Sequence, residues 1–584
     1  MDFFDVLTLI GGLCLFLFGM NVMGTSLEKR AGSGLKNLLG RLTTGKMAGF
    51  LTGLGVTAVI QSSSATTVMV VGFVNSGLMT LTQAINVIMG ANVGTTVTAW
   101  LLSLTGIQGD NFIVKMLKPT SFTPILALIG IILYMASKSG KKKDTGMILL
   151  GFATLMFGMD TMSSAVSGLS SVPEFRNILI MFSNPVLGVL AGAILTGIIQ
   201  SSSASVGILQ ALASTGQVTY GSAIPIIMGQ NIGTCVTALL SSVGTTKNAR
   251  RAAVVHLTFN IIGTAIWLSL FCLLNAIFKF AFVQLPADQM GIAIVHSIFN
   301  ILCTALLLPC SSMLEKFACR IIPDSKTEEN KTELDERLMT TPSIAIERCR
   351  IVTVEMATSA VDALDSSMNM IANYDADKAA RIREQEDETD RYEDNLGTYL
   401  VKLSTHAMSD QDSTESAKLL HVIGDFERIS DHAVNIVESA EEIQAKQIHF
   451  SPAAQRELDQ LIGAVRECLD LTLTAFKEND LETARKVEPL EQVIDVLHNQ
   501  LRSRQVLRLQ RGECTIEDGF VWSDLLTNME RVSDHCSNIA GCVLEMAHAS
   551  LDLHQFLSDV RAEDPQYGER YNAFAQKYAL VEED

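Results

Sequence analysis

The string Gln61-Ser62-Ser63-Ser64 lies in an apolar stretch and returns unchanged as Gln200-Ser201-Ser202-Ser203, 139 positions later. We call these two strings the tetrads. Two further strings recur at the same offset: Phe18-Gly19-Met20 as Phe157-Gly158-Met159, and Gly90-Ala91-Asn92-Val93-Gly94-Thr95 as Gly229-Gln230-Asn231-Ile232-Gly233-Thr234. One offset shared by more than seventy residues indicates that a single structural unit was duplicated.

The chain divides into two halves of opposite charge. Residues 1–315 contain 16 Lys and Arg against 9 Asp and Glu, whereas residues 316–584 contain 28 against 53, so the net charges are +7 and −25. The apolar content of 48% is high for a soluble protein of 584 residues. We therefore expect a membrane half followed by an acidic soluble half, and the acidic charge argues against a nucleic-acid partner.

Nine apolar runs fill the first half, at about 4–26, 48–77, 81–105, 120–137, 145–168, 186–216, 222–243, 252–283 and 290–313. A helix needs roughly 20 residues to cross a bilayer. The runs 48–77 and 186–216 carry the tetrads near their middle and are interrupted by Gly and hydroxyl residues. This pattern predicts two re-entrant helical hairpins, while the other seven runs are predicted to span the membrane.

Basic residues gather in four loops, at 27–47, 138–143, 247–251 and just after 315. The positive-inside rule places these loops in the cytoplasm, which fits two crossings in each of the intervals that contain a hairpin. The first repeat, about 1–138, then crosses three times, so the second repeat, about 140–283, begins on the opposite side. Such an inverted-topology repeat is an architecture of secondary transporters. It predicts an external N-terminus, a last membrane helix at 290–313 and a cytosolic second half.

The tetrads offer hydroxyl and carboxamide groups, which donate and accept hydrogen bonds. Hydroxyl donors and helix N-termini suit a small oxyanion, whereas neutral oxygen atoms suit a dehydrated Na⁺. Residues 48–105 and 186–243 contain no charged side chain, which favours cation coupling over proton coupling. The alternative is that these small residues only allow close helix packing. The repetition of the whole string favours a binding site.

These strings resemble the sodium-dependent phosphate cotransporter family, the type II Na⁺/Pi symporters and their bacterial relatives. The resemblance covers about residues 1–315. It implies that phosphate is bound by Ser62, Ser63, Ser64, Ser201, Ser202 and Ser203. It also implies that sodium and substrate share Gln61, Thr66, Asn92, Thr95, Gln200, Asn231 and Thr234. The second copy has Cys235 in place of Thr96, so no hydroxyl ligand is expected there.

Two His/Asn pairs follow, His256 with Asn260 and His296 with Asn300. Residues four apart share a helix face. We favour hydrogen bonds to neighbouring helices over a ligand site for these pairs.

The second half begins with a polar stretch that predicts a linker over 316–342. Beyond it, long helical periodicities predict a cytosolic helical domain over 343–584. We expect helices at about 343–373, 376–407, 412–446, 452–478, 481–510 and 518–550, with a tail helix near 567–581. These helices would form two three-helix units.

A second duplication appears in this half, at an offset of 103. Glu427-Arg428-Ile429-Ser430-Asp431-His432 returns as Glu530-Arg531-Val532-Ser533-Asp534-His535. Upstream, Glu386 and Asp390 match Glu491 and Asp495 at an offset of 105. Each Glu-x-x-x-Asp pair places two carboxylates on one helix face. Carboxylates on facing helices form metal sites for hard or borderline cations. A solvated acidic face is the alternative.

This half is similar to the PhoU family of phosphate-response regulators. The resemblance implies a pair of three-helix bundles with a divalent or trivalent metal of unknown identity. The implied ligands are Glu386, Asp390, Glu427, Asp431, Glu491, Asp495, Glu530 and Asp534.

The sequence thus predicts an all-α polytopic membrane protein with inverted-topology repeats, two re-entrant hairpins and a soluble PhoU-like pair of three-helix bundles. We expect Na⁺-coupled transport of inorganic phosphate across the cytoplasmic or plasma membrane, and no enzyme activity. Three alternatives stay open: another small anion, phosphate export, and a membrane-anchored signalling scaffold. The expected partners are phosphate, sodium and the lipid bilayer, and either a homodimer or a phosphate-signalling protein remains to be tested.

Overall fold

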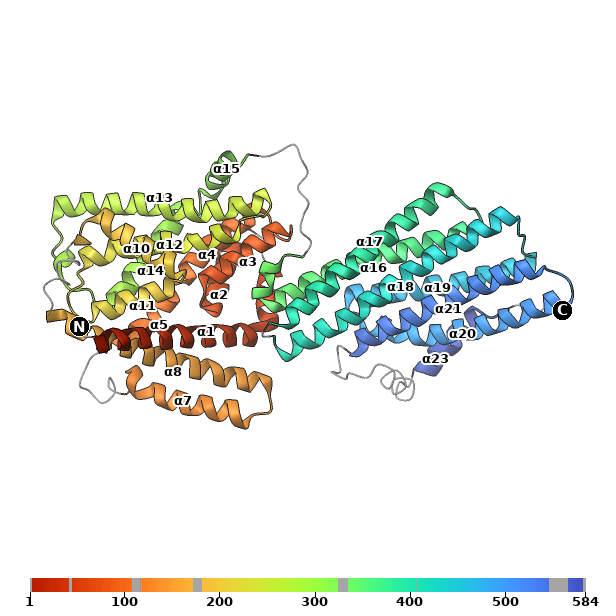
Figure 1. The fold of residues 1–584 in the computed structure, drawn as a ribbon, viewed down its shortest axis with the longest axis horizontal. Helices are drawn as coiled ribbons and strands as arrows, with labels where there is room; N and C mark the ends of the chain where they lie inside the picture. The colour runs from red at the N-terminus through yellow and green to blue at the C-terminus, as the bar shows by residue number, and fades with distance from the viewer. Residues whose placement is uncertain are drawn as a thin grey trace. The chain divides into compact units, whose positions relative to one another are not determined.

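The computed structural model describes residues 3–40, 45–107, 116, 118–171, 181–323, 334–406, 408–545 and 566–580. These residues form two compact units, Met1–Ile344 and Ala345–Asp584. Helices are the regular secondary structure throughout this described part of the chain (Figure 1). The predicted all-α fold class is therefore confirmed.

The first unit contains two sets of helices that correspond to the repeats. The first set is α1 (Phe3–Gly40), α2 (Lys46–Ile60), α3 (Ser63–Asn75), α4 (Leu81–Gly94), α5 (Thr96–Ser103), the short η1 (Leu104–Gly106) and α7 (Pro119–Ala136). The second set is α8 (Gly140–Val166), η2 (Ser167–Ser171), α10 (Pro185–Ile199), α11 (Ser202–Ala213), α12 (Tyr220–Ser241) and α13 (Lys247–Phe278). After these come η3 (Ala281–Gln284), α14 (Gln289–Leu307), α15 (Ser311–Ile321) and η4 (Glu336–Thr340).

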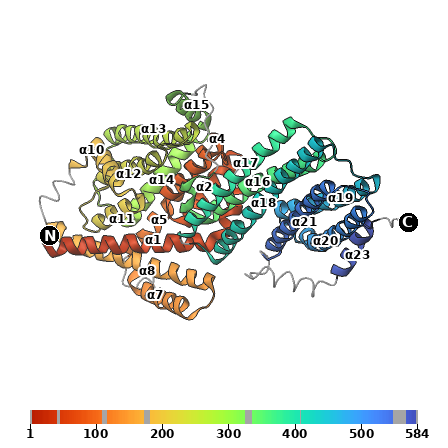
Figure 2. The same cartoon turned by 45° about the vertical axis from the view of Figure 1, so that its right-hand side comes forward.

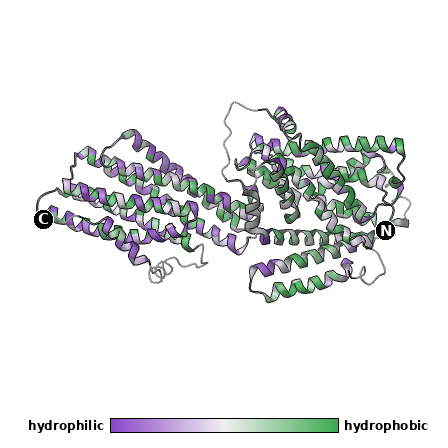
Figure 3. Cartoon of the chain, turned by 180° about the vertical axis from the view of Figure 1, so that it is seen from behind, coloured by the Kyte–Doolittle hydropathy of each residue, from purple (hydrophilic) through white to green (hydrophobic). Residues whose placement is uncertain are grey.

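Seven segments of the described chain are long and apolar enough to span a membrane: Phe3–Arg30, Leu81–Gly106, Pro119–Ala136, Gly140–Leu169, Tyr220–Ser241, Lys247–Phe278 and Gln289–Leu307. They coincide with the seven predicted spans. Large apolar side chains on these helices are exposed, as on α7, where Met135 is 77% exposed. Figure 3 colours the ribbon of these helices mostly green, for hydrophobic residues. Because such a surface is unfavourable in water, it identifies the unit as a membrane domain.

The helices that contain the tetrads are too short to cross. α2 and α3 have 15 and 13 residues, and α10 and α11 have 15 and 12. At 1.5 Å per residue each reaches only about 18–23 Å, less than the roughly 30 Å of a hydrocarbon core. Each pair breaks at its tetrad, as predicted for the re-entrant hairpins.

The packing of α1 against α8 shows how the repeats are related. A Cβ on Gly12 would lie 3.1 Å from the carbonyl oxygen of Gly158, and one on Gly19 would lie 2.7 Å from that of Gly151. The residue numbers of the contacting glycines rise along α1 while they fall along α8, so the two helices are antiparallel. Gly12 and Gly19 correspond to Gly151 and Gly158 in the repeat, so equivalent helices run in opposite directions (Figure 1). This is the inverted topology that loop charge predicts.

The second unit contains α16 (Pro342–Met370), α17 (Ala376–Ser404), α18 (Asp410–Lys446), α19 (Pro452–Glu478), α20 (Leu481–Gln510), α21 (Ile516–Glu545) and α23 (Tyr567–Lys577). The observed helices match the predicted ranges to within a few residues. In Figure 3 their ribbons alternate between purple and green, as expected from the amphipathic periodicity from which they were predicted. Figure 2 separates α19, α20, α21 and α23 most clearly.

The stretch 316–342, predicted as a linker, is partly helical in the residues that the structure describes. α15 continues to Ile321, and η4 spans Glu336–Thr340 with Leu338 and Met339 buried. The polar composition of the whole stretch hides these two apolar residues, of which Leu338 packs over Gly72 of α3.

Candidate functional site

Both hairpins reverse direction at the Gln of the tetrad. Gln61 and Gln200 adopt the left-handed conformation, with φ of 60° and 57°. Their amides donate to the carbonyl oxygens of Thr57 and Thr196 at 2.8 and 2.7 Å, which ends α2 and α10. Few residues other than glycine adopt this conformation, so its repetition in both hairpins indicates a fixed turn.

The first Ser of each tetrad caps the helix that follows. Ser62 accepts a hydrogen bond from the amide of Ala65, and Ser201 accepts one from the amide of Ala204, both at 3.2 Å. The first amides of a helix have no partner within that helix, and its N-terminus carries a partial positive charge. The caps therefore direct the first turns of α3 and α11, with their remaining serines, toward the break in each hairpin.

The two breaks meet. The Ser64 hydroxyl donates to the carbonyl oxygen of Gln200 at 3.4 Å, which joins residues 136 positions apart in different repeats. Ser63, Ser202 and Ser203 are buried beside this contact in their own helices. Two positive helix ends and their hydroxyl groups thus converge inside the membrane domain.

A hydroxyl pair holds the two arms of each hairpin together. Thr57 donates to Thr66 at 3.0 Å in the first hairpin, and Thr196 donates to Ser205 at 2.8 Å in the second. Sequence reasoning selected Thr66 but missed Thr57 and Thr196. The signal that could have found them is again the offset of 139, because Thr57 and Thr196 are equivalent positions.

The Gly-x-Asn-x-Gly strings pack against the entering arms of the hairpins. A Cβ on Gly90 or Gly229 would lie 2.0 Å from the carbonyl oxygen of Phe50 or Val189. Gly94 and Gly233 also lie so close to the backbones of α2 and α10 that a Cβ would not fit at either position. These glycines bring α4 and α12 close to the tetrads, which is the structural reason for the second repeated string.

Four further predicted ligands are buried, but the described contacts do not join them to the tetrads: Asn92, Thr95, Asn231 and Thr234. The hydroxyls of Thr95 and Thr234 donate to the carbonyl oxygens of Ala91 and Gln230, one turn back at 2.9 Å. Asn231 donates to Ile227. In each case the donated hydrogen is used within the helix, while the threonine oxygens keep lone pairs that a cation could use.

The two glutamines of the tetrads differ in their surroundings. The Gln61 side chain accepts from Thr98 at 2.9 Å and donates to the carbonyl oxygen of Ala58. It is 6% exposed, whereas Gln200 is exposed. The site is therefore built from equivalent backbones but is not symmetric in its side chains.

The His/Asn pairs make interhelical and intrahelical hydrogen bonds. His256 lies 3.3 Å from the Asn92 side-chain oxygen, and both residues are buried. Asn260 donates to the sulfur of Cys235 at 3.3 Å and to the carbonyl oxygen of His256. Asn300 donates to the carbonyl oxygen of His296. The contacts of His256 and Asn260 fit the structural role that the sequence favours, and they attach α13 to Asn92. The described contact of the second pair lies within α14, so its bonding to a neighbouring helix stays a prediction.

Carboxylates from facing helices gather at two places in the second unit. Glu386, Asp390 and Asp431 form one cluster, and Glu491, Asp495 and Asp534 form the other. In each cluster the carboxylate oxygens can lie within 4.8 Å of one another, which is close enough for one metal ion to bridge them. Glu427 and Glu530 are outside these clusters, so the structure brings together three of the four predicted ligands in each repeat.

Burial and mutual repulsion raise the pKa of these acids. Burial, then Asp431 and Asp390, raises the pKa of Glu427 to about 7. Burial is also the main cause that raises the pKa of Glu491 to about 8, with Glu488 and Asp495 adding repulsion. The pKa values of Glu386, Asp390, Glu530 and Asp534 are raised as well, mainly by burial. Carboxyl groups this close together lose their protons less readily, because their negative charges repel one another. A bound metal cation would offset this repulsion and stabilise the carboxylates.

Two histidines link the repeats of the second unit. His432 on α18 lies 2.8 Å from the Asn528 oxygen on α21, and His535 on α21 lies 2.9 Å from the Asp425 oxygen on α18. These pairs are related by the offset of 103, and the two rings lie 5.8 Å apart. The histidine that ends each repeated string therefore joins α18 to α21 beside the carboxylate clusters.

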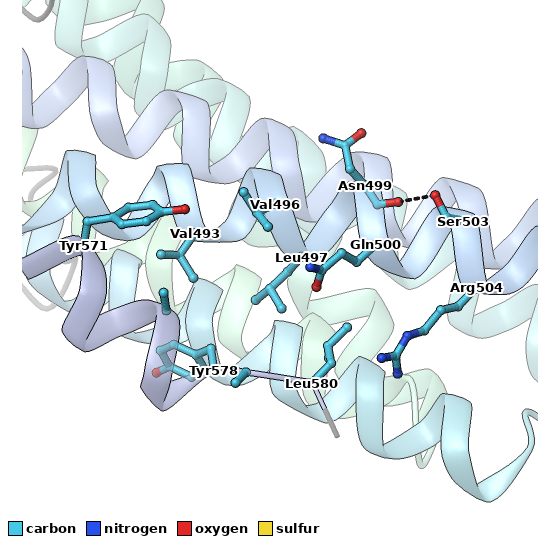
Figure 4. A pocket seen from close by; sticks show the side chains of 12 residues that line it. Val493, Val496, Leu497, Asn499, Gln500, Ser503, Arg504, Tyr571, Tyr578 and Leu580 are labelled. Atoms are coloured by element: carbon cyan, nitrogen blue, oxygen red, sulfur yellow. Dashed lines mark hydrogen bonds between the residues drawn. The ribbon is translucent and has the colours of Figure 1, made fainter. Parts of the chain in front are cut away.

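A groove of about 780 Å³ lies between α20 and α23 in the second unit. Figure 4 shows Val493 and Val496 above Tyr578 and Leu580, with Tyr571 at the left beside Val493. The Lys577 ammonium and the Tyr578 hydroxyl donate hydrogen bonds to the Glu467 carboxylate on α19, at 2.8 and 2.7 Å. These bonds fix α23 beside the groove. The groove contains none of the predicted site residues.

A duplicated, inverted membrane domain with two broken hairpins that meet at their turns defines a secondary transporter. Residues 15–164 and 166–295 match the Na⁺/Pi-cotransporter family, and residues 353–440 and 458–543 match the PhoU domain. The chain belongs to the Na⁺/Pi-cotransporter family and carries PhoU domains behind its membrane domain.

Two protein relatives have names that agree with this assignment. The chain is 25% identical over 546 residues to "Putative inorganic phosphate export protein YjbB" of Escherichia coli O157:H7, covering 92% of this chain and 97% of that protein. It is 42% identical over 137 residues to "Sodium-dependent phosphate transport protein 2B" of Homo sapiens, covering 22% and 19%. A crystal structure of PhoU from Pseudomonas aeruginosa aligns with a TM-score of 0.33 and 20% identity over 35% of this chain and 97% of that one.

Proposed function

We propose that this protein carries inorganic phosphate across the cytoplasmic or plasma membrane in a step coupled to Na⁺. The contact between Ser64 and Gln200 supports the proposal most directly, because it brings both tetrads to one place. Phosphate would accept hydrogen bonds from Ser62, Ser63 and Ser64 and from Ser201, Ser202 and Ser203. The N-termini of α3 and α11 would each stabilise the anion by roughly 0.3–1 kcal/mol or more.

Sodium would be bound by neutral oxygen atoms around the same place. The candidates are Gln61, Thr66, Asn92, Thr95, Gln200, Asn231 and Thr234. Their hydroxyl, amide and carbonyl oxygens suit Na⁺, and a cation beside phosphate lowers the cost of removing both ions from water. Alternating access would then expose this shared site first to one side of the membrane and afterwards to the other.

Phosphate flux into proteoliposomes tests the proposal. With an inward Na⁺ gradient, labelled phosphate should accumulate, and replacing Na⁺ by K⁺ should abolish accumulation. Flux that is equal in both salts would refute sodium coupling. Competition by excess sulfate or arsenate would show whether another anion shares the site.

A matched pair of variants separates anion binding from helix capping. Both Ser62→Asn and Ser62→Asp can cap α3, since Asn and Asp are good N-cap residues. Only Ser62→Asp adds a negative charge, and a like charge at ~4 Å costs about 4 kcal/mol at an effective dielectric constant near 20. We expect Ser62→Asp to reduce flux at least a hundredfold more than Ser62→Asn. Equal flux through the two variants would place phosphate elsewhere.

Export is the second candidate direction, since the relative that aligns over 92% of this chain is named as a phosphate exporter. Net phosphate movement in cells that contain the protein, measured with Na⁺ inside or outside, distinguishes export from uptake.

The loop charges support an external N-terminus and a cytosolic second unit. Labelling of tags at the two ends of the chain in intact cells tests this orientation.

The second unit would regulate transport and bind metal. Glu386, Asp390 and Asp431 would hold one ion, and Glu491, Asp495 and Asp534 another. Glu427, which is repelled by Asp431, and Glu530, which repels Asp534, would remain outside the two sets of closest oxygens. If the membrane unit were only an anchor for signalling, the chain shortened after Ile344 would carry no phosphate. A regulated transporter should still carry it.

A further inference from the structure

The segment that precedes the second unit is fastened to the first hairpin. We call residues 335–340 the latch; it consists of Asp335 and η4. Asn75, the last residue of α3, donates to the Asp335 carboxylate at 2.7 Å. Asn75 also accepts from the backbone amide of Thr246, which precedes α13, at 2.8 Å. One side chain therefore joins the hairpin, the latch and the start of α13.

Arg337 completes this polar network. Its guanidinium lies 2.9 Å from Asp335 and donates to the carbonyl oxygen of Val243 at 3.1 Å. Its backbone amide donates to the second Asp335 oxygen at 2.9 Å. Asp335 is 3% exposed. A buried carboxylate is stable only with such partners, so the network holds the latch in a single position.

An apolar contact lies next to the network. Leu338 is fully buried over Gly72, where a Cβ would approach the leucine to 2.9 Å. The second hairpin has Ala211 and Ser214 at the positions of Gly72 and Asn75. The two residues that receive the latch are thus absent from the repeat that has no latch, although the tetrads of the two hairpins are identical.

The latch is linked to the proposed binding site through one short helix. α3 carries Ser63 and Ser64 in its first turn and Asn75 at its other end, about 20 Å away. A short helix moves as a rigid body, so a restraint at Asn75 also restrains the serines. On the other side, Thr341 alone separates η4 from α16, the first helix of the PhoU-like region.

We propose that the latch inhibits transport. While it is docked it holds the first hairpin in place, and its release frees the hairpin to move during transport. This inference rests on the proposed transport function and adds a route for its regulation. A conformational change in the second unit would reach the hairpin through α16 and Asp335. Loss of the contact between Asn75 and Asp335 should therefore increase the rate of transport.

Exchanging the two partners tests the contact in the full-length protein. Asp335→Asn removes the charge that pairs with Arg337, and Asn75→Asp places two carboxylates face to face. The double variant Asn75→Asp with Asp335→Asn restores one donor opposite one acceptor, and the carboxylate introduced at position 75 can still accept from Thr246. Glu478→Gln is the control, because it removes one negative charge from an exposed side chain of α19, outside the latch.

Two measurements give the result. Hydrogen exchange of the amides of residues 335–341 should be roughly tenfold faster or more in either single variant, as expected from the loss of a buried charge-assisted hydrogen bond. It should return toward the wild-type rate in the double variant. The initial rate of phosphate flux should rise several-fold in the single variants and return in the double variant, while Glu478→Gln leaves both measurements unchanged.

Three outcomes would overturn the proposal. Unchanged exchange in the single variants would show that the contact does not hold the latch. Faster exchange with unchanged flux would show a docked connector without control of transport. Equal loss of flux in both single variants and the double variant would show a structural role only. Absence of flux in the wild-type protein refutes the transport proposal instead, and the exchange rates then decide whether the latch docks.

Discussion

Gly53→Ala should damage the first hairpin through a single methyl group. Gly53 lies on α2, where a Cβ would be 2.0 Å from the carbonyl oxygen of Val87 on α4. Real Cβ contacts are essentially never shorter than 3.0 Å, so α2 and α4 must separate by about 1 Å. The obstacle is a backbone atom, and no change of side-chain rotamer can relieve it.

The cost follows from this displacement. Overpacking of this kind destabilises a core by about 1–3 kcal/mol. α2 leads directly into Gln61, and a misplacement of ~1 Å near a site can reduce activity about a hundredfold. We expect Gly53→Ala to lower the thermal unfolding midpoint in detergent and to reduce Na⁺-driven phosphate uptake in proteoliposomes by roughly this factor.

Gly55→Ala is the matched control on the same helix, since a Cβ at Gly55 has no neighbour within 4 Å. Alanine favours a helix over glycine by about 0.5–1 kcal/mol, so this variant should keep full uptake with equal or higher stability. The second hairpin offers the same comparison, with Gly192 2.1 Å from the Ile226 oxygen and Gly197 in ordinary contact. Equal uptake and equal unfolding midpoints for Gly53→Ala and Gly55→Ala would refute the close approach of α2 and α4.

Further predictions concern both units. Thr57→Val and Thr196→Val remove the hydroxyl donors that join the arms of the hairpins. Each should lower the free energy of unfolding by about 0.6–1.7 kcal/mol, and the two variants should slow phosphate flux to a similar degree. A divalent cation should raise the unfolding midpoint of the second unit in the full chain by binding the folded state, with a smaller rise in Asp495→Asn and an unchanged rise in the exposed control Glu478→Gln. Since the folded-state pKa of Glu491 is about 8, above its ordinary value of 4.5, the metal-free folded state retains a proton that the unfolded chain has lost. Its stability should therefore fall as pH rises from 4.5 through 8, and Glu491→Gln should flatten this fall in thermal unfolding measured in a chelator.

The fold was accessible from the sequence because its strongest signals are local or repeated. Apolar runs, their lengths and the interruption at each tetrad predict seven spans and two hairpins, all of which the structure contains. Helical periodicity places the helices of the second unit to within a few residues. Loop charge, which reflects how a chain is inserted into a membrane, predicts the inversion that the antiparallel packing of α1 and α8 displays.

The candidate site was only partly accessible. The tetrads could be selected by their repetition, but Thr57 and Thr196 could not, since isolated threonines in an apolar helix are common and most serve packing. Among the carboxylates, spacing along one helix groups Glu386 with Asp390. Only the packing of α17 against α18 shows that Asp431, and not Glu427, completes the cluster of closest oxygens.

The sequence by itself determined the duplication, the order of helices and the division into an apolar and an acidic half, because each follows from composition or periodicity along the chain. The tertiary structure alone decided that Ser64 meets Gln200, and that Asp335, within a predicted linker, bonds Asn75 at the end of the first hairpin. Both contacts join residues more than a hundred positions apart. Such partners depend on how helices pack in three dimensions, and the residues near each partner in the sequence contain no record of that packing.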